Sequence, residues 1–548
     1  MAGVLILGVA LVLRETRGLS FFGDEWDFLV DRRGMSPDVL LTPHGPHLSL
    51  IPILIYKLLL QLFGASSYLP FRLLAAFDLV LLALALAVVT RAHWGRWWGV
   101  AAVLLLVTLG PGGESLLWPF QVGYAISVAA GVLALVVVTR DDRRADLIAC
   151  AALIVSLASA SQGVGFVVGV AVVIVLRGNW RGRAWIPVVP AILYGLWYLK
   201  YGHQYSETHL SLWPMSLSYV AQSLSATFAP LLGLSSVSPQ TGLLDTTFGV
   251  PVALAAIAAA SYACWRGWRP PALFWGATAT LVVLWIAASL SNTAAFYRPP
   301  NDPRYLSTNA VLVLVCLCVA VPRPRLARVG VIAACLVLAV VAATNASQYS
   351  AARTSMETSD IASRAELGAL LILGGVVSPA FTPALPGDPA VLVNVQNAAS
   401  FFSFVDAFGA ITASPATILR QSEVTRETVD RELARGELSL SPAPPSPSTA
   451  AITPTILSGT AAAKDSCLVL GTAPLVIRAQ PHRLQLTAGR QGPLSITMRR
   501  FATAYAVNLG QVPAGTTAIA SAPLDRAPQI PWQMMLTGPG SRVCTLPG

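Results

Sequence analysis

A short polar segment near the start of the chain is rich in side chains that could move protons or bind metals. Between Phe21 and Leu50 lie several carboxylates and two imidazoles, in a chain that is only 11% charged and 55% hydrophobic. The ones that could do chemistry here are Asp24, Glu25, Asp27, Asp31, His44 and His47. These groups exchange protons and bind divalent metals near neutral pH. We therefore predict a catalytic loop. The alternative is a solvated loop whose acids cap a helix, because Asp24 and Glu25 precede Trp26.

The rest of the chain is dominated by apolar runs that must position this loop. Stretches such as Leu79 to Val89 carry no charge, which predicts a mostly α-helical protein that crosses a membrane several times. The expected spans number about eleven and cover residues 2–13, 71–90, 97–111, 121–139, 146–160, 163–177, 185–200, 248–265, 272–290, 305–321 and 329–343. Although the formal net charge is +10, the basic residues form short clusters between spans, so we expect no nucleic-acid partner.

These basic clusters also predict the orientation of the spans. If the amino end is cytoplasmic, every inward loop is basic: Arg91 and Arg96; Arg140, Arg143 and Arg144; Arg177, Arg181 and Arg183; Arg266 and Arg269; Arg323, Arg325 and Arg328. By the positive-inside rule, the acidic loop and the whole carboxy-terminal region then lie outside the plasma membrane. We read Leu48 to Phe63 as a helix in the outer interface, because a further crossing would invert this pattern.

The outer segments of the amino-terminal part resemble the glycosyltransferase C superfamily of polyprenyl-phosphate-sugar-dependent transferases. The matching pieces are Gly23 to Asp27, His44 to His47, Phe63-Gly64, the Arg72 that opens the second span, and the second outer loop, Glu114 to Gln121. The likeness is strongest to an actinobacterial branch of uncharacterised members with an outer carboxy-terminal domain. The acidic pair is Asp-Glu instead of Asp-x-Asp, which leaves dependence on Mg²⁺ or Mn²⁺ open.

This resemblance implies sugar transfer from a polyprenyl-phosphate donor, usually with inversion, at the outer face. A carboxylate must take the proton of the acceptor hydroxyl, and we assign this role to Asp24, with Glu25 and Asp27 as neighbouring catalytic candidates. Cations must bind the departing phosphate. The candidates at outer span ends are Arg72, Lys200, Arg298 and Arg304. For Arg72 the alternative is an interfacial anchor, and for Arg304 a structural ion pair with Asp302.

The remaining outer polar residues are candidates for orienting the acceptor or for holding a metal. His44, His47 and Glu114 are assigned to acceptor binding or orientation, although Glu114 could be a simple polar loop residue. His203, Glu207 and His209 have a spacing that could hold a metal if the loop turns inward, with Glu25 as a further candidate ligand. The alternative is a solvated loop.

Four segments are expected along the chain. Residues 1–344 form the membrane domain, 345–438 an extracytoplasmic helical stem, 439–456 a Ser/Pro/Ala linker, and 457–548 a small all-β, sandwich-like domain. The stem helices are expected over 349–371, 391–408 and 423–435, and the strands include 468–470, 475–477, 483–486 and 494–498. The β domain is either a sugar-binding module or a structural cap.

The two cysteines of the carboxy-terminal region predict a disulfide. Cys467 and Cys544 are the only cysteines after the last expected span, so one intramolecular pairing exists there. The outer face can be oxidising, and the two residues flank the β unit, Cys467 in its expected first strand and Cys544 in its last. Two unpaired thiols are the alternative. The other five cysteines fall inside apolar runs or spans, where a thiol behaves as a small hydrophobe.

Together these features predict a multi-pass membrane glycosyltransferase. Its partners would be the lipid bilayer, a polyprenyl-phosphate sugar, and a cell-envelope glycan, lipid or protein acceptor. The alternative is a non-catalytic transporter or scaffold for lipid-linked polysaccharide, a class that often shows internal repeats and mid-membrane ionisable residues. The chain has no evident repeat, and its polar residues collect at outer span ends, with Asp78 the main exception.

Overall fold

The chain folds into two compact units in a computed structural model of its 548 residues. The structure describes all residues except 206–207, 239–240, 293–296, 324, 384–396, 445–453, 465, 480–482 and 547–548. The first unit comprises Met1–Leu19, Arg32–Phe63 and Tyr68–Glu357, and the second comprises Ser20–Asp31, Gly64–Ser67 and Thr358–Gly548. The polar segment near the start of the chain is therefore divided, with its acidic half in the second unit and its histidines in the first.

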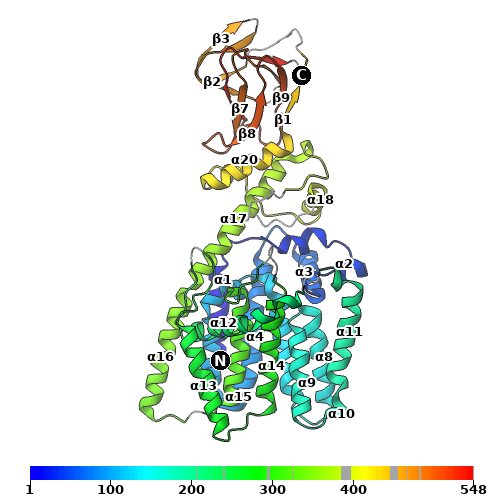
Figure 1. The fold of residues 1–548 in the computed structure, drawn as a ribbon, viewed down its shortest axis with the longest axis vertical. Coiled ribbons are helices and arrows are strands. Elements are labelled where there is room, and N and C mark those ends of the chain that lie inside the picture. The colour runs from blue at the N-terminus through cyan, green and yellow to red at the C-terminus, as the bar shows by residue number, and fades with distance from the viewer. Residues whose placement is uncertain are drawn as a thin grey trace. The chain divides into compact units, whose positions relative to one another are not determined.

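The first unit is a helical bundle (Figure 1). Its helices are α1 (Ala2–Glu15), α2 (Pro37–Leu41), α3 (Leu50–Phe63), α4 (Leu69–Trp94), α5 (Arg96–Val107), α6 (Gly113–Leu117), α7 (Val122–Val137), α8 (Arg143–Ser159), α9 (Gly163–Leu176), α10 (Trp180–Arg183), α11 (Trp185–Lys200), α12 (Trp213–Leu231), α13 (Gly249–Trp265), α14 (Ala272–Leu290), α15 (Leu306–Ala320) and α16 (Arg328–Ser347). Short 3-10 turns join them at Gly110–Gly112, Pro119–Gln121, Gly202–Tyr205, Leu210–Leu212 and Pro303–Tyr305.

The apolar helices confirm a multi-pass membrane protein. Within the described residues, five helices are long and apolar enough to cross a membrane: Leu69–Trp94, Pro119–Val137, Ala272–Leu290, Pro303–Ala320 and Arg328–Val376. A sixth span results if Arg96–Val107 and Gly110–Leu117, which bend by 52° at their junction, are counted together. A helix covers each of the expected apolar segments, but the larger span count and the orientation stay predictions.

Helix α12 lies between the expected spans 185–200 and 248–265, where no helix was expected from the sequence. Its hydropathy is interrupted by serines, yet several of these are buried, among them Ser216 and Ser223. The Ser216 hydroxyl lies 3.1 Å from the Ser289 hydroxyl of α14, so hydrogen bonding between small side chains joins the two helices. The serines that lower the apolar signal of α12, so that the sequence did not predict it, are thus part of its packing.

Close packing also joins α9 to α14 through small residues. A Cβ atom added at Gly169 would come within 2.2 Å of the Thr280 hydroxyl oxygen and 2.6 Å of the Gly276 carbonyl oxygen. Only glycine allows the two helix backbones to approach this closely. The pairing fixes α9 against α14 and so holds the loop that precedes α9.

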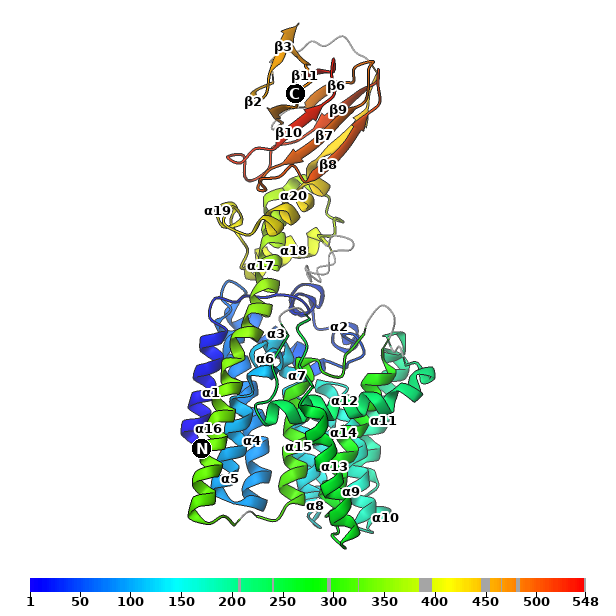
Figure 2. The ribbon, with the colours of Figure 1, turned by 60° about the vertical axis from the view of Figure 1, so that its left-hand side comes forward.

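The second unit combines a helical part with two antiparallel sheets (Figure 2). Its helices are α17 (Tyr349–Leu373), which begins in the first unit, α18 (Ala398–Phe408), α19 (Pro415–Ile418) and α20 (Glu423–Glu437), with a π-helical turn at Asp27–Asp31 and a 3-10 turn at Gly374–Val376. The expected stem helices are present, although residues 391–396 of the second lie outside the described residues. Helix α19 is an addition.

The strands form one sheet of six and one of five (Figure 2). They are β1 (Ser439–Pro442), β2 (Ile456–Ser458), β3 (Ala461–Lys464), β4 (Cys467–Leu470), β5 (Leu475–Arg478), β6 (Arg483–Thr487), β7 (Leu494–Arg499), β8 (Val507–Val512), β9 (Thr517–Ser521), β10 (Gln533–Thr537) and β11 (Arg542–Leu546). The strand orders are β1-β9-β6-β11-β4-β3 and β2-β5-β10-β7-β8. Side chains alternate between buried and half-buried along β7, as expected for a strand with one face on a core.

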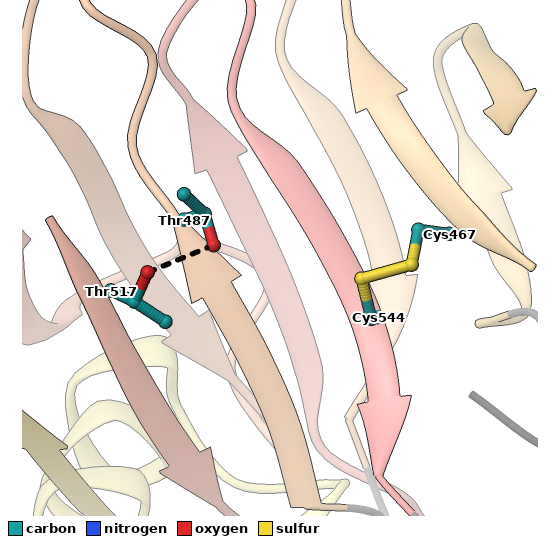
Figure 3. Close-up of a disulfide and its surroundings, with 4 residues drawn as sticks. All are labelled: Cys467, Thr487, Thr517 and Cys544. Atoms are coloured by element: carbon teal, nitrogen blue, oxygen red, sulfur yellow. Dashed lines mark hydrogen bonds between the residues drawn. A yellow bond between two sulfur atoms is a disulfide. The ribbon is translucent and has the colours of Figure 1, made fainter. Parts of the chain in front are cut away.

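The predicted disulfide between Cys467 and Cys544 is present (Figure 3). The two residues are direct register partners on the antiparallel strands β4 and β11, with Cα atoms 4.4 Å apart. This spacing is that of a pair whose backbones do not hydrogen-bond to each other, where side chains are closest. Cys467 lies in β4 instead of the first strand, because three earlier strands join the sheets.

A buried charge cluster joins α20 to the sheets. The Asp430 carboxylate accepts hydrogen bonds from the backbone N–H groups of Arg500, Phe501 and Ala502, at 2.7, 2.8 and 3.0 Å. The Arg500 guanidinium is wholly buried and forms ion pairs with Glu437, at 3.1 Å, and with Asp525. Its N–H groups also reach the carbonyl oxygens of Ile530 and Ala527, so the buried charge is well satisfied.

Candidate functional site

The acidic half of the polar segment is anchored inside the second unit. Trp26 is buried and packs edge-on against Phe401 and Phe404 of α18, with ring centroids 6.2 and 6.0 Å apart. Glu25 is also buried, and its carboxylate accepts a hydrogen bond from the Phe22 backbone N–H at 3.3 Å. Asp24 is half-buried, so within this turn it is more accessible to a substrate than Glu25.

The rest of the acidic half forms a short helical turn. Asp27 is half-buried and starts the π-helical turn Asp27–Asp31, while Phe28, Leu29 and Val30 are buried within it. Asp24 and Glu25 lie at the start of this helical segment, which is compatible with the capping alternative, and the catalytic assignment of Asp24 and Asp27 stays a prediction.

The histidine half forms a tight turn in the first unit. His44 and His47 exchange two backbone hydrogen bonds of 3.0 Å, and Gly45 between them has a φ of 52°, a left-handed conformation that glycine adopts without strain. The His44 ring lies edge-on to Phe120, with centroids 5.2 Å apart. The His47 ring stands against Tyr124 in the first turn of α7.

Four polar side chains from separate parts of the first unit form a hydrogen-bonded chain around His47. The Tyr124 hydroxyl lies 3.1 Å from Nε2 of His47, and Nδ1 of His47 lies 2.9 Å from Oγ of Ser161. Ser161 precedes α9, donates to the Pro46 carbonyl oxygen at 2.8 Å, and accepts from the Tyr194 hydroxyl at 3.3 Å. The sequence pointed to His47 but gave no separate reason to select its three partners.

A second cluster gathers around Arg304 at the start of α15. Its Nε atom lies 3.0 Å from Oδ2 of Asp302 and 3.5 Å from Oε1 of Glu114, and Asp302 also caps the turn by accepting from the Arg304 backbone N–H at 3.0 Å. The side chains of Arg304 and Glu114 are 35% and 28% exposed, whereas that of Asp302 is only 10% exposed. Two outer loops that are far apart in sequence thus meet, and the cluster stays open to solvent.

The Arg304 and His47 groups are neighbours. Tyr124 lies close enough to Arg304 and Tyr305 for their charges to interact, and Tyr219 of α12 stands in the same relation to Asp302 and Arg298. Arg298 donates to the Ser291 carbonyl oxygen at 2.6 Å. Of the predicted site residues, the structure therefore brings together His44, His47, Glu114, Arg298 and Arg304, together with Asp302.

The two other predicted phosphate-binding cations have different surroundings. The Arg72 guanidinium donates to the Thr16 hydroxyl at 3.1 Å and to the Leu13 carbonyl oxygen, contacts that close the end of α1. Lys200 ends α11, with its ammonium 4.8 Å from the centre of the Tyr201 ring. These contacts favour an anchoring role for Arg72.

The predicted metal ligands are spread over separate places. His203 and His209 are exposed, Glu207 lies outside the described residues, and Glu25 belongs to the second unit. In the part of the chain that the structure describes, no three His, Cys, Asp or Glu side chains gather as a metal site would require.

Comparison with solved structures gives a likeness in fold. The crystal structure of ArnT from Cupriavidus metallidurans bound to undecaprenyl phosphate aligns with 75% of this chain and 89% of that one, at 12% sequence identity and a TM-score of 0.43. No family model and no curated protein matches the chain. Since this TM-score lies below 0.5, the case for function rests on this chain's own residues.

The residues that the sequence did not single out share a recognisable pattern. Ser161 lies in a short turn between two apolar helices, and Tyr124 follows directly after the aromatic second loop. Polar residues in such a turn, here Ser161 and Gln162, are expected to find hydrogen-bond partners when they are shielded from water. Such residues at the ends of apolar helices are the signal that could have predicted the cluster.

Proposed function

We propose that this protein is a membrane glycosyltransferase that transfers a sugar from a polyprenyl-phosphate donor to a cell-envelope acceptor, with inversion. The observation that carries the proposal is the partly exposed Arg304, held by Glu114 and Asp302 at the start of the apolar helix α15. An accessible guanidinium at the end of a membrane helix suits a phosphate whose lipid chain lies in the bilayer. We place this site at the outer face on the pattern of basic loops.

The geometry of Arg304 leaves it suited to an anion despite its two carboxylate neighbours. Both contacts are made through Nε, on one edge of the guanidinium. The two Nη atoms carry four further N–H donors, and a bidentate contact to phosphate uses such donors. We assign them to the phosphate oxygens, with Arg298 as a second cation and Lys200 and Arg72 as weaker candidates.

The bond changes in the proposed transfer define which other groups are needed. The acceptor oxygen attacks the anomeric carbon, the bond between that carbon and the phosphate oxygen breaks, and the acceptor proton passes to a base. The donor phosphodiester carries one negative charge, and the departing polyprenyl phosphate carries two until it gains a proton. Asp24 is our proposed base, with Asp27 as its alternative, while Glu114 and the histidine turn orient the acceptor.

The direct experiment measures turnover in a purified system. The protein is placed in lipid nanodiscs with polyprenyl-phosphate sugars and an envelope-lipid extract, and release of polyprenyl phosphate is followed. Release that requires both protein and acceptor supports the proposal. Movement of lipid-linked sugar across a vesicle membrane, without release of polyprenyl phosphate, would instead support the transporter and reject the transferase.

A further inference from the structure

The donors and acceptors in the hydrogen-bonded chain around His47 determine which ring nitrogen carries the hydrogen. Ser161 has one hydroxyl hydrogen, and that hydrogen is donated to the Pro46 carbonyl oxygen at 2.8 Å. Its oxygen therefore presents a lone pair to Nδ1 of His47, 2.9 Å away, so Nδ1 must carry the hydrogen. The Tyr194 hydroxyl also donates to Ser161, which reinforces its acceptor role.

This tautomer determines the direction of the next hydrogen bond. In a neutral imidazole with hydrogen on Nδ1, the Nε2 atom is an acceptor, so the Tyr124 hydroxyl donates to it across 3.1 Å. When His47 is protonated, Nε2 becomes a donor and the bond reverses. The phenol oxygen then accepts from His47, and the phenol hydrogen is available to another acceptor.

Because Tyr124 lies near the Arg304 cluster, reversal of its hydrogen bond with His47 changes how its hydroxyl interacts with a bound phosphate. Tyr124 lies within electrostatic reach of Arg304 and Tyr305, which belong to the cluster that we assign to phosphate. Its hydroxyl would repel a phosphate oxygen when His47 is neutral and donate to it when His47 is charged. The charge of one histidine thus controls the polarity of a group beside the anion site.

The surroundings of His47 allow an imidazolium. Within its hydrogen-bonded chain the titratable groups are Tyr124 from α7, which bonds the ring directly, and Tyr194 from α11, which bonds it through Ser161, with His44 across the turn. Helices α7 and α9 carry no charged side chain, Lys200 ends α11, and the charges of α8 (Arg143, Arg144 and Asp146) lie in its first turn, at the opposite end from Ser161. Beyond Tyr124, the two carboxylates of Glu114 and Asp302 offset the two guanidinium groups of Arg304 and Arg298.

We propose that His47 and Tyr124 form a proton-transfer pair that protonates the departing polyprenyl phosphate. The inference rests on the proposed function and deepens it by naming the acid of the same site. In this step the bond between the anomeric carbon and the phosphate oxygen breaks, Tyr124 gives its hydroxyl proton to a phosphate oxygen, and Nε2 of the His47 imidazolium returns a proton to Tyr124. His47 ends neutral, and the phosphate leaves with one negative charge.

The pair predicts how phosphate affinity changes with pH. Because the ligand itself titrates in the same range, the informative quantity is the affinity of the wild type for polyprenyl phosphate divided by that of Tyr124→Phe. We expect this ratio to be about 10 at pH 5.5, where one charge-assisted hydrogen bond is added, and about 1 or less at pH 8.5. In the His47→Gln background, the same ratio should not change with pH, because a glutamine side chain does not titrate.

The experiment measures binding of polyprenyl phosphate to the full chain in nanodiscs across this pH range. Tyr262→Phe, which removes the hydroxyl of an exposed residue of α13, is the matched control and should behave as the wild type. If the wild type binds no polyprenyl phosphate, the proposed function falls and the role of the pair with it. If it binds but the ratio is the same at both pH values, the proposed function stands and the pair is rejected.

An independent measurement tests the proton positions without any ligand. In protein labelled with ¹⁵N-histidine, the His47 signals are identified as those lost in His47→Gln. Above the pKa of the ring, we expect a protonated Nδ1 and an unprotonated Nε2. The opposite tautomer would overturn the inference, because the Tyr124 hydroxyl would then accept from neutral His47 and no reversal would occur.

Discussion

Two arginine clusters of this protein are built from similar side chains and differ mainly in access. Arg500 and its partners Glu437 and Asp525 are wholly buried, whereas Arg304 and Glu114 are about one-third exposed. Around Arg500, carboxylates and backbone carbonyl oxygens supply contacts on both edges of the guanidinium. Around Arg304, both ion pairs use one nitrogen. An enclosed charge is out of a ligand's reach and acts within the fold, where loss of one partner is costly, whereas an accessible charge can bind a ligand.

The largest effect is expected from removing the enclosed arginine. Arg500→Ala leaves the Glu437 and Asp525 carboxylates buried without their cation, which should destabilise the second unit by about 3–5 kcal/mol. Hydrogen exchange of the backbone amides in β7, measured on the full chain, reports this loss of stability. Arg499→Ala, on the neighbouring residue, is the control. Equal hydrogen-exchange protection of β7 in the wild type and in Arg500→Ala would show that Arg500 does not stabilise the second unit, which would contradict this prediction.

The disulfide should contribute a similar but smaller amount. Replacing both Cys467 and Cys544 by serine removes a cross-link over 77 residues, which should lower the stability of the second unit by about 2–4 kcal/mol. Non-reducing peptide mass spectrometry and hydrogen exchange measure the link and its effect. Binding of polyprenyl phosphate by the Arg304 cluster of the first unit should change little; a loss as large as that of Arg304→Ala would contradict the distinction between an enclosed and an accessible arginine cluster.

The acidic turn of the second unit gives the next test. Asp24→Asn keeps the size of the side chain and removes its proton affinity, so turnover should fall about 100-fold while donor binding is kept. Donor binding and single-turnover rates are measured on the same preparation. Near-normal turnover in Asp24→Asn with a large loss in Asp27→Asn would move the base to Asp27.

The smallest effect concerns the pH dependence of stability in the second unit. Burial raises the pKa of Glu432 to about 8, and burial likewise raises the pKa of Glu437 to about 8. Because these folded-state values exceed the ordinary glutamate value, the folded state binds more protons between about pH 4.5 and 8, and stability falls as pH rises through this window. We expect each of the two groups to add about 1 kcal/mol of stability from pH 8 to pH 7, measured by hydrogen exchange corrected for its intrinsic rate.

Two carboxylates of the same unit have lowered pKa values and do not contribute to this pH dependence between pH 6 and 8. Burial acts to raise the pKa of Asp525, but the Arg500 guanidinium outweighs it and lowers that pKa overall. Hydrogen bonds from Thr503 and Ala504 lower the pKa of Glu423. The contributions of both groups are therefore lost only below the ordinary range of carboxylates. Glu432→Gln should flatten the dependence between pH 6 and 8. A stability that rises with pH in this window would contradict the assignment.

The sequence predicted those features that depend on local pattern. Apolar runs gave the positions of the long helices, alternating residues gave strands such as β7, and two isolated cysteines gave the disulfide. It did not predict α12, because buried serines that bond to α14 lower its apolar signal. It also treated the polar segment near the start as one site, although packing of Trp26 on α18 assigns the acidic half to the second unit.

The candidate site was predictable only in part for a related reason. Arg304 and Glu114 stood out as charges at span ends, and the Asp302 ion pair was foreseen as an alternative because the two residues are close in sequence. The contacts of His47 with Tyr124 and Ser161 join residues 77 and 114 positions apart. Such pairs arise from helix packing, which a single sequence does not specify.

The most direct test of the central claim compares the two arginines in one assay. Binding of polyprenyl phosphate and turnover of its sugar derivative are measured per folded molecule for Arg304→Ala, Arg500→Ala and the exposed control Arg266→Ala. We predict that Arg304→Ala loses about 100-fold or more in turnover and binds phosphate weakly, with the second unit intact. The other two should keep both properties. Wild-type binding and turnover in Arg304→Ala would contradict the account.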